Sequence, residues 1–396
     1  MHTQVLGRFM KALKFKQNGS IIPTIAFSMV AMMGMAGMVF DASNVFSSKT
    51  RLQNIIDATT MTAANVLDET FSQAQARNAA RKIFDENIDQ PGNGTLKDIG
   101  LTSTDLVIQF SDTRNPFIAS PAATRFARVR INPGTASVDT IFMKILGIEA
   151  LELAGSAVAG PSPALGTVCN LTPTIICGDS FIPPDANGMF GYNYGDQVTL
   201  ALGDNKNNDV GPGNYQLLSV DESAKGGNAV RDYMAGGYTG CATSTQTIET
   251  KPGKTKGPVT QGINTRFGIF SGPVSEDDYP PDLVTDAGAN GYPDTYAEYT
   301  LDNSTKSYDE PSDGIASRRV VNVAFGNCTG TVNGRGDVPI IGFGCVFLNQ
   351  PMAKDDALFG ELVRECKSGG IPGPAPIDGP GIHTIQLYGD PDRWDS

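Results

Sequence analysis

The sequence has few of the residues on which most catalytic and metal sites depend. It contains only two histidines, His2 and His383, and its six cysteines include no Cys-x-x-Cys pair. A zinc knuckle or a thioredoxin-like redox site is therefore not expected. A Gly-rich phosphate loop of the Walker type is also missing. We accordingly predict no catalytic residue, no metal and no cofactor.

Basic side chains are scarce as well. The chain has 30 Lys and Arg residues against 42 Asp and Glu, which gives a net charge of −12. A nucleic-acid binder needs a basic surface to face the phosphates, so nucleic acid is not an expected partner. The first twenty residues are an exception, because they contain no acid and four basic residues: Arg8, Lys11, Lys14 and Lys16.

Charge disappears completely between Lys16 and Asp41. The segment Ile21–Phe40 would span about 30 Å as a helix, which is the thickness of the hydrocarbon core of a membrane. The basic flank before it predicts a cytoplasmic N-terminus, with everything after Asp41 on the outer side. Gly34 and Gly37 form one thin face of this helix and are our candidates for contact with another membrane helix.

Two other kinds of protein begin with a similar apolar segment. A secretory signal peptide has a shorter apolar core, and the best cleavage site here, Gly34-Met35-Ala36, is marginal. A prepilin would be cut after Gly19 and would have Glu five residues later, where this chain has Thr24. We therefore expect a permanent anchor and no incorporation as a major pilin subunit.

Glycine and proline number 45 and 25, yet neither occurs from Met38 to Gln90. Their absence is a strong helix signal, and apolar residues recur every three or four positions over Leu52–Phe71. The membrane helix is predicted to continue outward as a long amphipathic helix to Phe84. Such a helix needs a second surface to cover its apolar stripe.

A small sheet is predicted to supply that surface. Leu106–Phe110, Arg125–Ile131 and Leu151–Ala159 read as strands, whereas Thr140–Ile148 is ambiguous between helix and strand. A long helix laid across a small antiparallel sheet is an α+β arrangement that is pilin-like in outline. Gly160–Gly166 then reads as a linker.

The remainder of the chain is rich in turns and contains all the cysteines. We predict a β-rich domain with strands at 194–202, 319–325, 338–348 and 383–389, and a short helix within Ala353–Cys366. An even number of cysteines after a membrane segment indicates three disulfides in an oxidising compartment. Sequence closeness suggests the pairs Cys169–Cys177, Cys328–Cys345 and Cys241–Cys366, although sequence alone cannot establish connectivity.

Three local motifs each resemble part of a catalytic or metal-binding pattern, but each lacks a required residue or spacing. Gly178–Phe181 resembles the nucleophile block of GDS-type esterases, with Ser180 as nucleophile and His383 as base, but Pro380 stands where that family has Asp. Oxygen-bearing side chains gather over Gly203–Asn214 and could hold Ca²⁺, yet the EF-hand spacing is missing. Asp41–Val45 lacks the last Ser of a von Willebrand A metal motif.

The N-terminal region resembles the TadE/TadG-like proteins of the Flp (tight adherence, Tad) pilus assembly system. The matching positions are Gly19, Asp41, Leu52-Gln53, Asp57-Ala58 and Ala63-Ala64. The likeness covers residues 1–160 well, including the run Phe142–Ala159, and the rest in patches such as 211–218 and 257–268. The missing metal motif indicates a short TadG-like form without a von Willebrand A domain.

The resemblance implies a non-enzymatic bacterial inner-membrane protein that acts as a periplasmic scaffold or anchor in pilus assembly. Its expected partners are other Tad proteins and the inner membrane, with the cell wall as a further candidate. The predicted parts are a cytoplasmic tail (1–20), a membrane helix (21–40), an α+β module (41–160) and a Cys- and Gly-rich domain (161–396). The alternatives are a secreted or surface binding and adhesion protein, cleaved near Ala36, and a periplasmic esterase.

Overall fold

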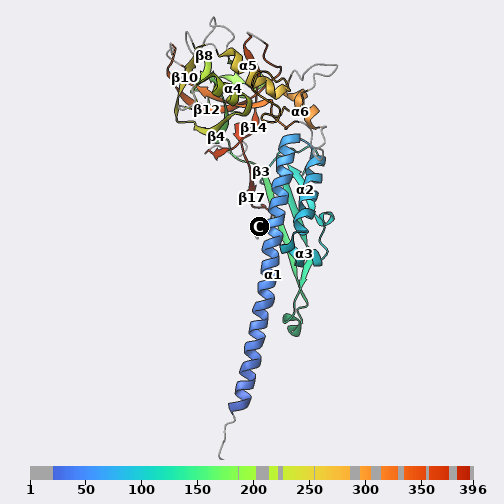
Figure 1. Cartoon of the computed structure of the whole chain (residues 1–396). Coiled ribbons are helices and arrows are strands. Elements are labelled where there is room, and N and C mark those ends of the chain that lie inside the picture. The colour runs from blue at the N-terminus through green and yellow to red at the C-terminus, as the bar shows by residue number, and fades with distance from the viewer. Residues whose placement is uncertain are drawn as a thin grey trace, which may run out of the picture.

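The computed structural model describes residues 21–185, 187–201, 214–221, 226–253, 255–285, 295–304, 314–328, 334–353, 356–373 and 381–392. The predicted basic tail (1–20) and most of the Asp/Asn-rich stretch 203–214 lie outside these residues. A long helix and a small sheet form a stalk, and a β-rich head lies at one end of it (Figure 1).

The stalk is built on helix α1 (Ile21–Thr70), which is 50 residues long. Its first half exposes apolar side chains, whereas Leu52, Ile56 and Leu67 in its second half are fully buried. Among the described residues it is the one helix long and apolar enough to cross a membrane. The prediction of an apolar helix that continues into an amphipathic one is confirmed.

The helix does not run on to Phe84 as predicted. Phe71 has a left-handed backbone (φ 54°) that ends α1, and Ser72 caps a second helix, α2 (Gln73–Ile88). The Ser72 hydroxyl accepts a hydrogen bond from the Gln75 backbone N–H at 3.4 Å. The chain therefore reverses, and α2 packs beside α1 (Figure 1). An N-cap serine after a left-handed residue can turn a chain without Gly or Pro.

Three short helices lead from α2 to the first sheet: η1 (Pro91–Asn93), α3 (Gly94–Asp98) and η2 (Ser103–Asp105). The sheet itself is antiparallel, in the order β1-β2-β3-β17. Its strands are β1 (Val107–Ser111), β2 (Phe126–Asp139), β3 (Ala150–Pro161) and β17 (Ile385–Tyr388). The apolar core of the stalk lies between this sheet and the α1–α2 hairpin. The α+β class is confirmed.

The ambiguous segment Thr140–Ile148 forms neither a full helix nor a strand. It is the connection between β2 and β3 and contains one short 3-10 helix, η3 (Met143–Leu146). The predicted linker is mostly strand, since β3 ends at Pro161 and β4 begins at Leu165.

The head contains a nine-stranded sheet with the main order β10-β8-β4-β11-β12-β13-β7, while β9 and β15 also pair with β4. Its strands are β4 (Leu165–Cys177), β7 (Gln197–Ala201), β8 (Asn214–Leu218), β9 (Tyr238–Thr243), β10 (Thr247–Pro252), β11 (Val320–Gly326), β12 (Asp337–Phe347), β13 (Leu358–Val363) and β15 (Gly370–Pro372). The helix predicted within Ala353–Cys366 is wrong, because β13 occupies that segment as an inner strand between β12 and β7.

Smaller elements complete the head. Two short strand pairs are β5 (Gly188–Met189) with β6 (Tyr192–Asn193), and β14 (Glu365–Lys367) with β16 (Gly381–His383). The helices are α4 (Gly227–Gly236), α5 (Lys256–Asn264), η4 (Thr265–Phe267) and α6 (Tyr296–Ser304).

Three disulfides staple the head, as predicted, but the suggested pairing is wrong. The bonds are Cys169–Cys241, Cys177–Cys328 and Cys345–Cys366. Strand pairing determines which cysteines meet, because β4 and β9 run side by side with Cys169 opposite Cys241. Closeness in sequence failed as a guide because strands far apart in the chain are neighbours in the sheet.

Candidate functional site

The α1 residues that carried the family resemblance hold the helix on the sheet. The Gln53 amide donates hydrogen bonds to Asp57 (2.8 Å) and to the backbone oxygen of Ser156 on β3 (3.0 Å). Gly155 of β3 lies opposite these α1 residues, and an added Cβ there would lie 2.7 Å from the end of the Ile56 side chain. A residue without a side chain therefore lets the helix approach β3 closely. Ala63 and Ala64 of the same motif are fully buried.

Asp41 connects α1 to the connection between β2 and β3, which we call the tip loop (Thr140–Glu149). Its carboxylate accepts hydrogen bonds from the backbone N–H groups of Ile141 (3.0 Å), Phe142 (2.7 Å) and Met143 (2.7 Å). Burial of Asp41 would raise its pKa, but these three N–H groups, helped by the charge of Lys144, outweigh burial and lower the pKa. The carboxylate therefore stays charged and acts as a clamp on the loop.

The two glycines predicted to contact a membrane helix have different surroundings. A Cβ at Gly37 would lie 2.4 Å from the Phe142 ring, whereas a Cβ at Gly34 would meet no atom within 4 Å. Phe142 also meets Phe40 edge to face, with ring centroids 6.3 Å apart. Gly37 thus contacts the tip loop of its own chain. A contact of Gly34 with a second membrane helix stays a prediction.

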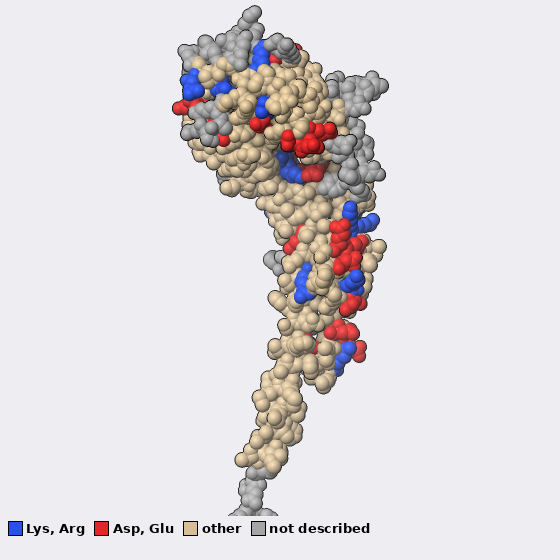
Figure 2. All heavy atoms as spheres, in the orientation of Figure 1, with Lys and Arg blue, Asp and Glu red and all other residues tan. Residues whose placement is uncertain are grey.

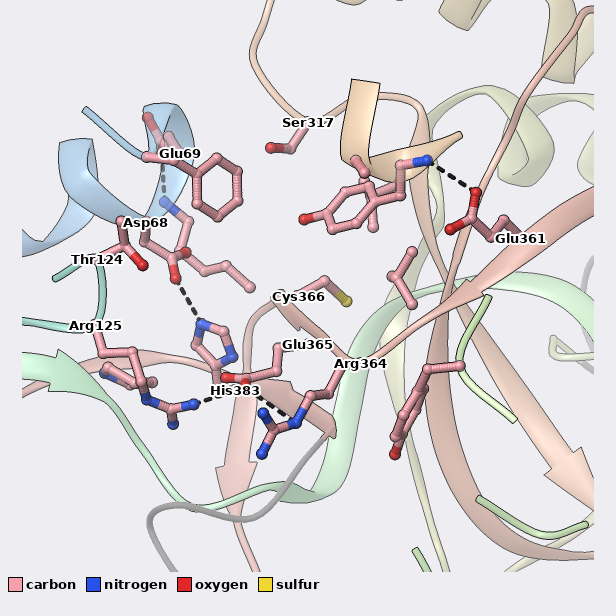
Figure 3. A pocket seen from close by; sticks show the side chains of 18 of the residues that line it. Asp68, Glu69, Thr124, Arg125, Ser317, Glu361, Arg364, Glu365, Cys366 and His383 are labelled. Carbon is pink, nitrogen blue, oxygen red and sulfur yellow. Dashed lines mark hydrogen bonds and ion pairs between the residues drawn. The ribbon is translucent and has the colours of Figure 1, made fainter. Parts of the chain in front are cut away.

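A cleft of about 700 Å³ lies where stalk and head meet (Figure 3). The stalk contributes Asp68 and Glu69 from the end of α1, while the head contributes Lys367 and His383 from β14 and β16. His383 Nε2 lies 2.9 Å from Asp68 Oδ1, and Lys367 forms an ion pair with Glu69. These two pairs join the last turn of α1 to the head.

A third ion pair borders the same cleft. Arg125 at the start of β2 contacts Glu365 of β14 at 2.6 Å, and Arg364 approaches the same carboxylate at 3.7 Å. Figure 3 shows both guanidinium groups directed at Glu365, from two sides. The junction therefore carries alternating charges from stalk and head, most of them partly buried.

The junction contains His383, and the ordinary pKa of histidine lies near neutrality. Burial would lower its pKa, but the charge and hydrogen bond of Asp68 outweigh burial and raise the pKa above its usual value. Its side chain is 7 % exposed, so this ion pair is shielded from water.

The geometry does not bring the two predicted esterase residues together. Ser180, the candidate esterase nucleophile, is exposed and lines other hollows of the head, whereas His383 lies in the junction cleft bound to Asp68. Cys366 also lines the cleft but is bonded to Cys345. Within the described parts of the chain, no group of three His, Cys, Asp or Glu side chains is placed to hold a metal ion.

The sequence did not reveal the junction pairs. Asp68, Glu69, Arg125, Glu365 and Lys367 belong to elements separated by hundreds of positions, and no local pattern marks them. His383 stands out in the sequence only because histidine is rare here. By contrast, the family resemblance marked Asp41, Gln53 and Asp57 on α1, because these residues belong to one continuous stretch of sequence.

The N-terminal part of the chain matches a known family. Residues 19–66 match the family model Tad, described as "Putative Flp pilus-assembly TadE/G-like". The resemblance stated from the sequence is therefore confirmed over that segment, which covers nearly all of α1. No curated protein and no solved structure shows a significant match to the chain.

Proposed function

We propose that this chain is a membrane-anchored, non-enzymatic component of bacterial Flp/Tad pilus assembly that acts as a periplasmic scaffold or anchor. The observation that carries the proposal is the place of the family match on the fold. The matched residues 19–66 include the whole apolar half of α1 together with Asp41, Gln53 and Asp57. The shared segment is thus an anchor combined with the contacts that hold a folded module to it.

The mechanism that we propose is mechanical. The apolar half of α1 tethers the protein in the inner membrane, and its second half carries the sheet. Two ion pairs then hold the head on the far end of the same helix, and a third, from Arg125, holds it on the stalk sheet. A continuous helix of 50 residues is about 75 Å long, so the head would stand well clear of the membrane surface. From there it would contact other Tad proteins, with the cell wall as a further candidate.

Topology is the first test. The chain is expressed in a bacterium with an N-terminal or a C-terminal epitope tag, and spheroplasts are treated with protease. We expect the C-terminal tag to be digested and the N-terminal tag to be protected until the membrane is lysed. Recovery of a mature protein that starts near residue 37 would instead support the secreted binding protein.

Assembly is the second test. In a host that encodes this chain with a Tad system, deletion of its gene should abolish or shorten Flp pili in electron micrographs. Complementation with the intact chain should restore them, whereas a chain in which residues 21–40 are replaced by a cleavable signal peptide should not. Normal pili in the deletion strain would contradict the proposal.

A further inference from the structure

The tip loop (Thr140–Glu149) exposes an unusual amount of apolar surface for a connection between two strands. Ile145 is 85 % exposed, Leu146 64 % and Ile141 63 %, and Phe142 and Ile148 are exposed to a smaller extent. A contiguous exposed apolar patch on a folded module indicates a contact with an apolar partner. The position of the tip loop on the fold indicates what this apolar partner is.

The loop lies at the end of the apolar half of α1. It is held there by Asp41, by the ring contact between Phe40 and Phe142, and by the fit of Phe142 against Gly37. If Ile21–Phe40 fills the hydrocarbon core, its last turn and the tip loop are at the same height. Figure 1 shows the loop reaching down beside α1, and Figure 2 shows no charged side chain on the visible face of the helix below it.

Most backbone N–H groups of the tip loop have hydrogen-bond acceptors within the protein, as a site with little water requires. Asp41 satisfies the N–H groups of three residues, and further backbone bonds satisfy four more: Thr140 to Glu149, Ile145 to Phe142, Gly147 to Lys144 and Ile148 to Met143. An unpaired backbone group costs several kcal/mol in lipid, so a loop can enter the interface only when its own contacts satisfy most of these groups. In a loop that faces water, solvent could accept these hydrogen bonds instead.

The position of the basic side chain in the loop also fits a contact with the membrane surface. The one basic residue of the loop, Lys144, is about half exposed and lies 3.8 Å from Asp139 at the base of the loop. A long lysine side chain can keep its ammonium group among lipid headgroups while its neighbours enter the apolar layer.

We propose that the tip loop inserts its apolar side chains into the interfacial layer of the membrane leaflet next to the folded module. The inference rests on the proposed membrane anchoring of α1. A single helix leaves a module free to rotate about the helix axis. A second lipid contact beside it fixes which face of the stalk is turned to the membrane and limits its tilt, so the head is presented in one orientation.

Depth-dependent quenching of tryptophan fluorescence tests this. The single tryptophan, Trp394, is replaced by Phe, and one tryptophan is introduced at Ile145 in the full chain. The protein is reconstituted into vesicles of phosphatidylcholine and phosphatidylglycerol, with or without bromine on the acyl chains. We expect Ile145→Trp to lose about half of its fluorescence, because an interfacial side chain reaches the acyl boundary. Leu146→Trp should give the same result and guards against a local defect of one variant.

Two control variants distinguish a failure of the tip-loop inference from a failure of the proposed anchor. Ile118→Trp is similarly exposed (62 %) but lies in the connection between β1 and β2, at the opposite end of the sheet, and should not be quenched. Phe27→Trp lies on the apolar half of α1 and should be quenched strongly. If Phe27→Trp is quenched while both loop variants are not, the tip-loop inference is overturned and the anchor stands.

Two other outcomes also overturn the inference. If Phe27→Trp is not quenched, the anchor itself fails and the inference with it. If the loop tryptophans have blue-shifted emission but are insensitive to bromine, protein covers the loop, and a second copy of the chain is its occupant.

Discussion

Asp41 is the residue at which the apolar helix and the folded module are joined. It is 3 % exposed, and its two carboxylate oxygens accept all three hydrogen bonds offered by the start of the tip loop. A neutral or shorter side chain cannot accept three such bonds equally well, because charge-assisted hydrogen bonds to backbone N–H groups are the stronger kind. One acid thus determines how the β2–β3 hairpin lies along α1.

Replacing this acid tests the clamp. In Asp41→Asn, the amides of Ile141, Phe142 and Met143 should exchange hydrogen about tenfold faster or more, because they lose a charged acceptor. Hydrogen exchange followed by mass spectrometry measures this in the detergent-solubilised chain. Asp98→Asn, on an exposed acid of α3, is the control and should leave the loop unchanged. Because the pKa of Asp41 is lowered, the wild-type clamp should hold near neutrality and weaken only as the pH falls through that lowered pKa.

The two glycines of α1 form a matched pair for a second prediction. Gly37→Val should displace Phe142 and loosen the tip loop, since even a Cβ would overlap the ring, whereas Gly34→Val has open space around it. We expect faster exchange over residues 140–149 in the first variant only. Equal effects of both substitutions would mean that the glycines act through another membrane helix, as the sequence first suggested.

At the scale of elements, the junction of α1 with β14 and β16 is held by charge. The pKa of His383 is raised by Asp68, so protonated His383 stabilises the folded state below its unfolded pKa, near 6.5, and this contribution is lost as the pH rises through the raised pKa.

Thermal unfolding of the full chain in detergent should show this dependence. The melting temperature should fall as the pH is raised from about 6 to about 9, because the buried ion pair loses its charge. In His383→Gln the dependence over that range should be smaller. A wild-type melting temperature that rises over the same range would contradict the assigned role of the pair.

The disulfides differ in the length of chain that they close. Cys177–Cys328 joins residues 151 positions apart, whereas Cys345–Cys366 joins residues 21 apart. Chain entropy predicts a loss of about 5 kcal/mol in the free energy of unfolding without the first bond and about 3 kcal/mol without the second. Paired Cys→Ser variants, unfolded in urea, measure the difference. Similar losses would mean that local packing around each bond outweighs loop entropy.

At the scale of the whole molecule, strand β17 links the head back to the stalk. Strand β17 leaves the head and pairs with β3 in the stalk sheet, and the buried Arg128 of β2 contacts Asp390 and Asp392 just beyond it. The stalk is therefore complete only when the last described residues are in place.

Truncation tests this link. A chain that ends at Thr384 should lose β17 and leave Arg128 buried without its acids, at a cost of about 3 kcal/mol or more. Urea unfolding compares it with a chain that ends at Asp392, which retains β17 and both acids that contact Arg128. Equal stability of the two truncated chains would show that β17 contributes nothing to the stalk.

The local patterns of this sequence determined the elements of the N-terminal part. The absence of charge before Asp41 and of Gly and Pro up to Gln90 established the long apolar helix and its helical continuation, and alternation over Arg125–Ile131 established a strand. Each of these signals is short-range, because backbone propensity and periodicity are read over one or a few turns. The family resemblance had the same local origin.

Only the tertiary structure decided what those elements contact. It paired Cys169 with Cys241, made a strand of the expected helix before Cys366, and returned β17 to the stalk. It also placed His383 against Asp68, 315 positions away in the chain. Such contacts depend on the order of strands in a sheet and on how two modules meet, and many arrangements of this kind are compatible with the same local patterns.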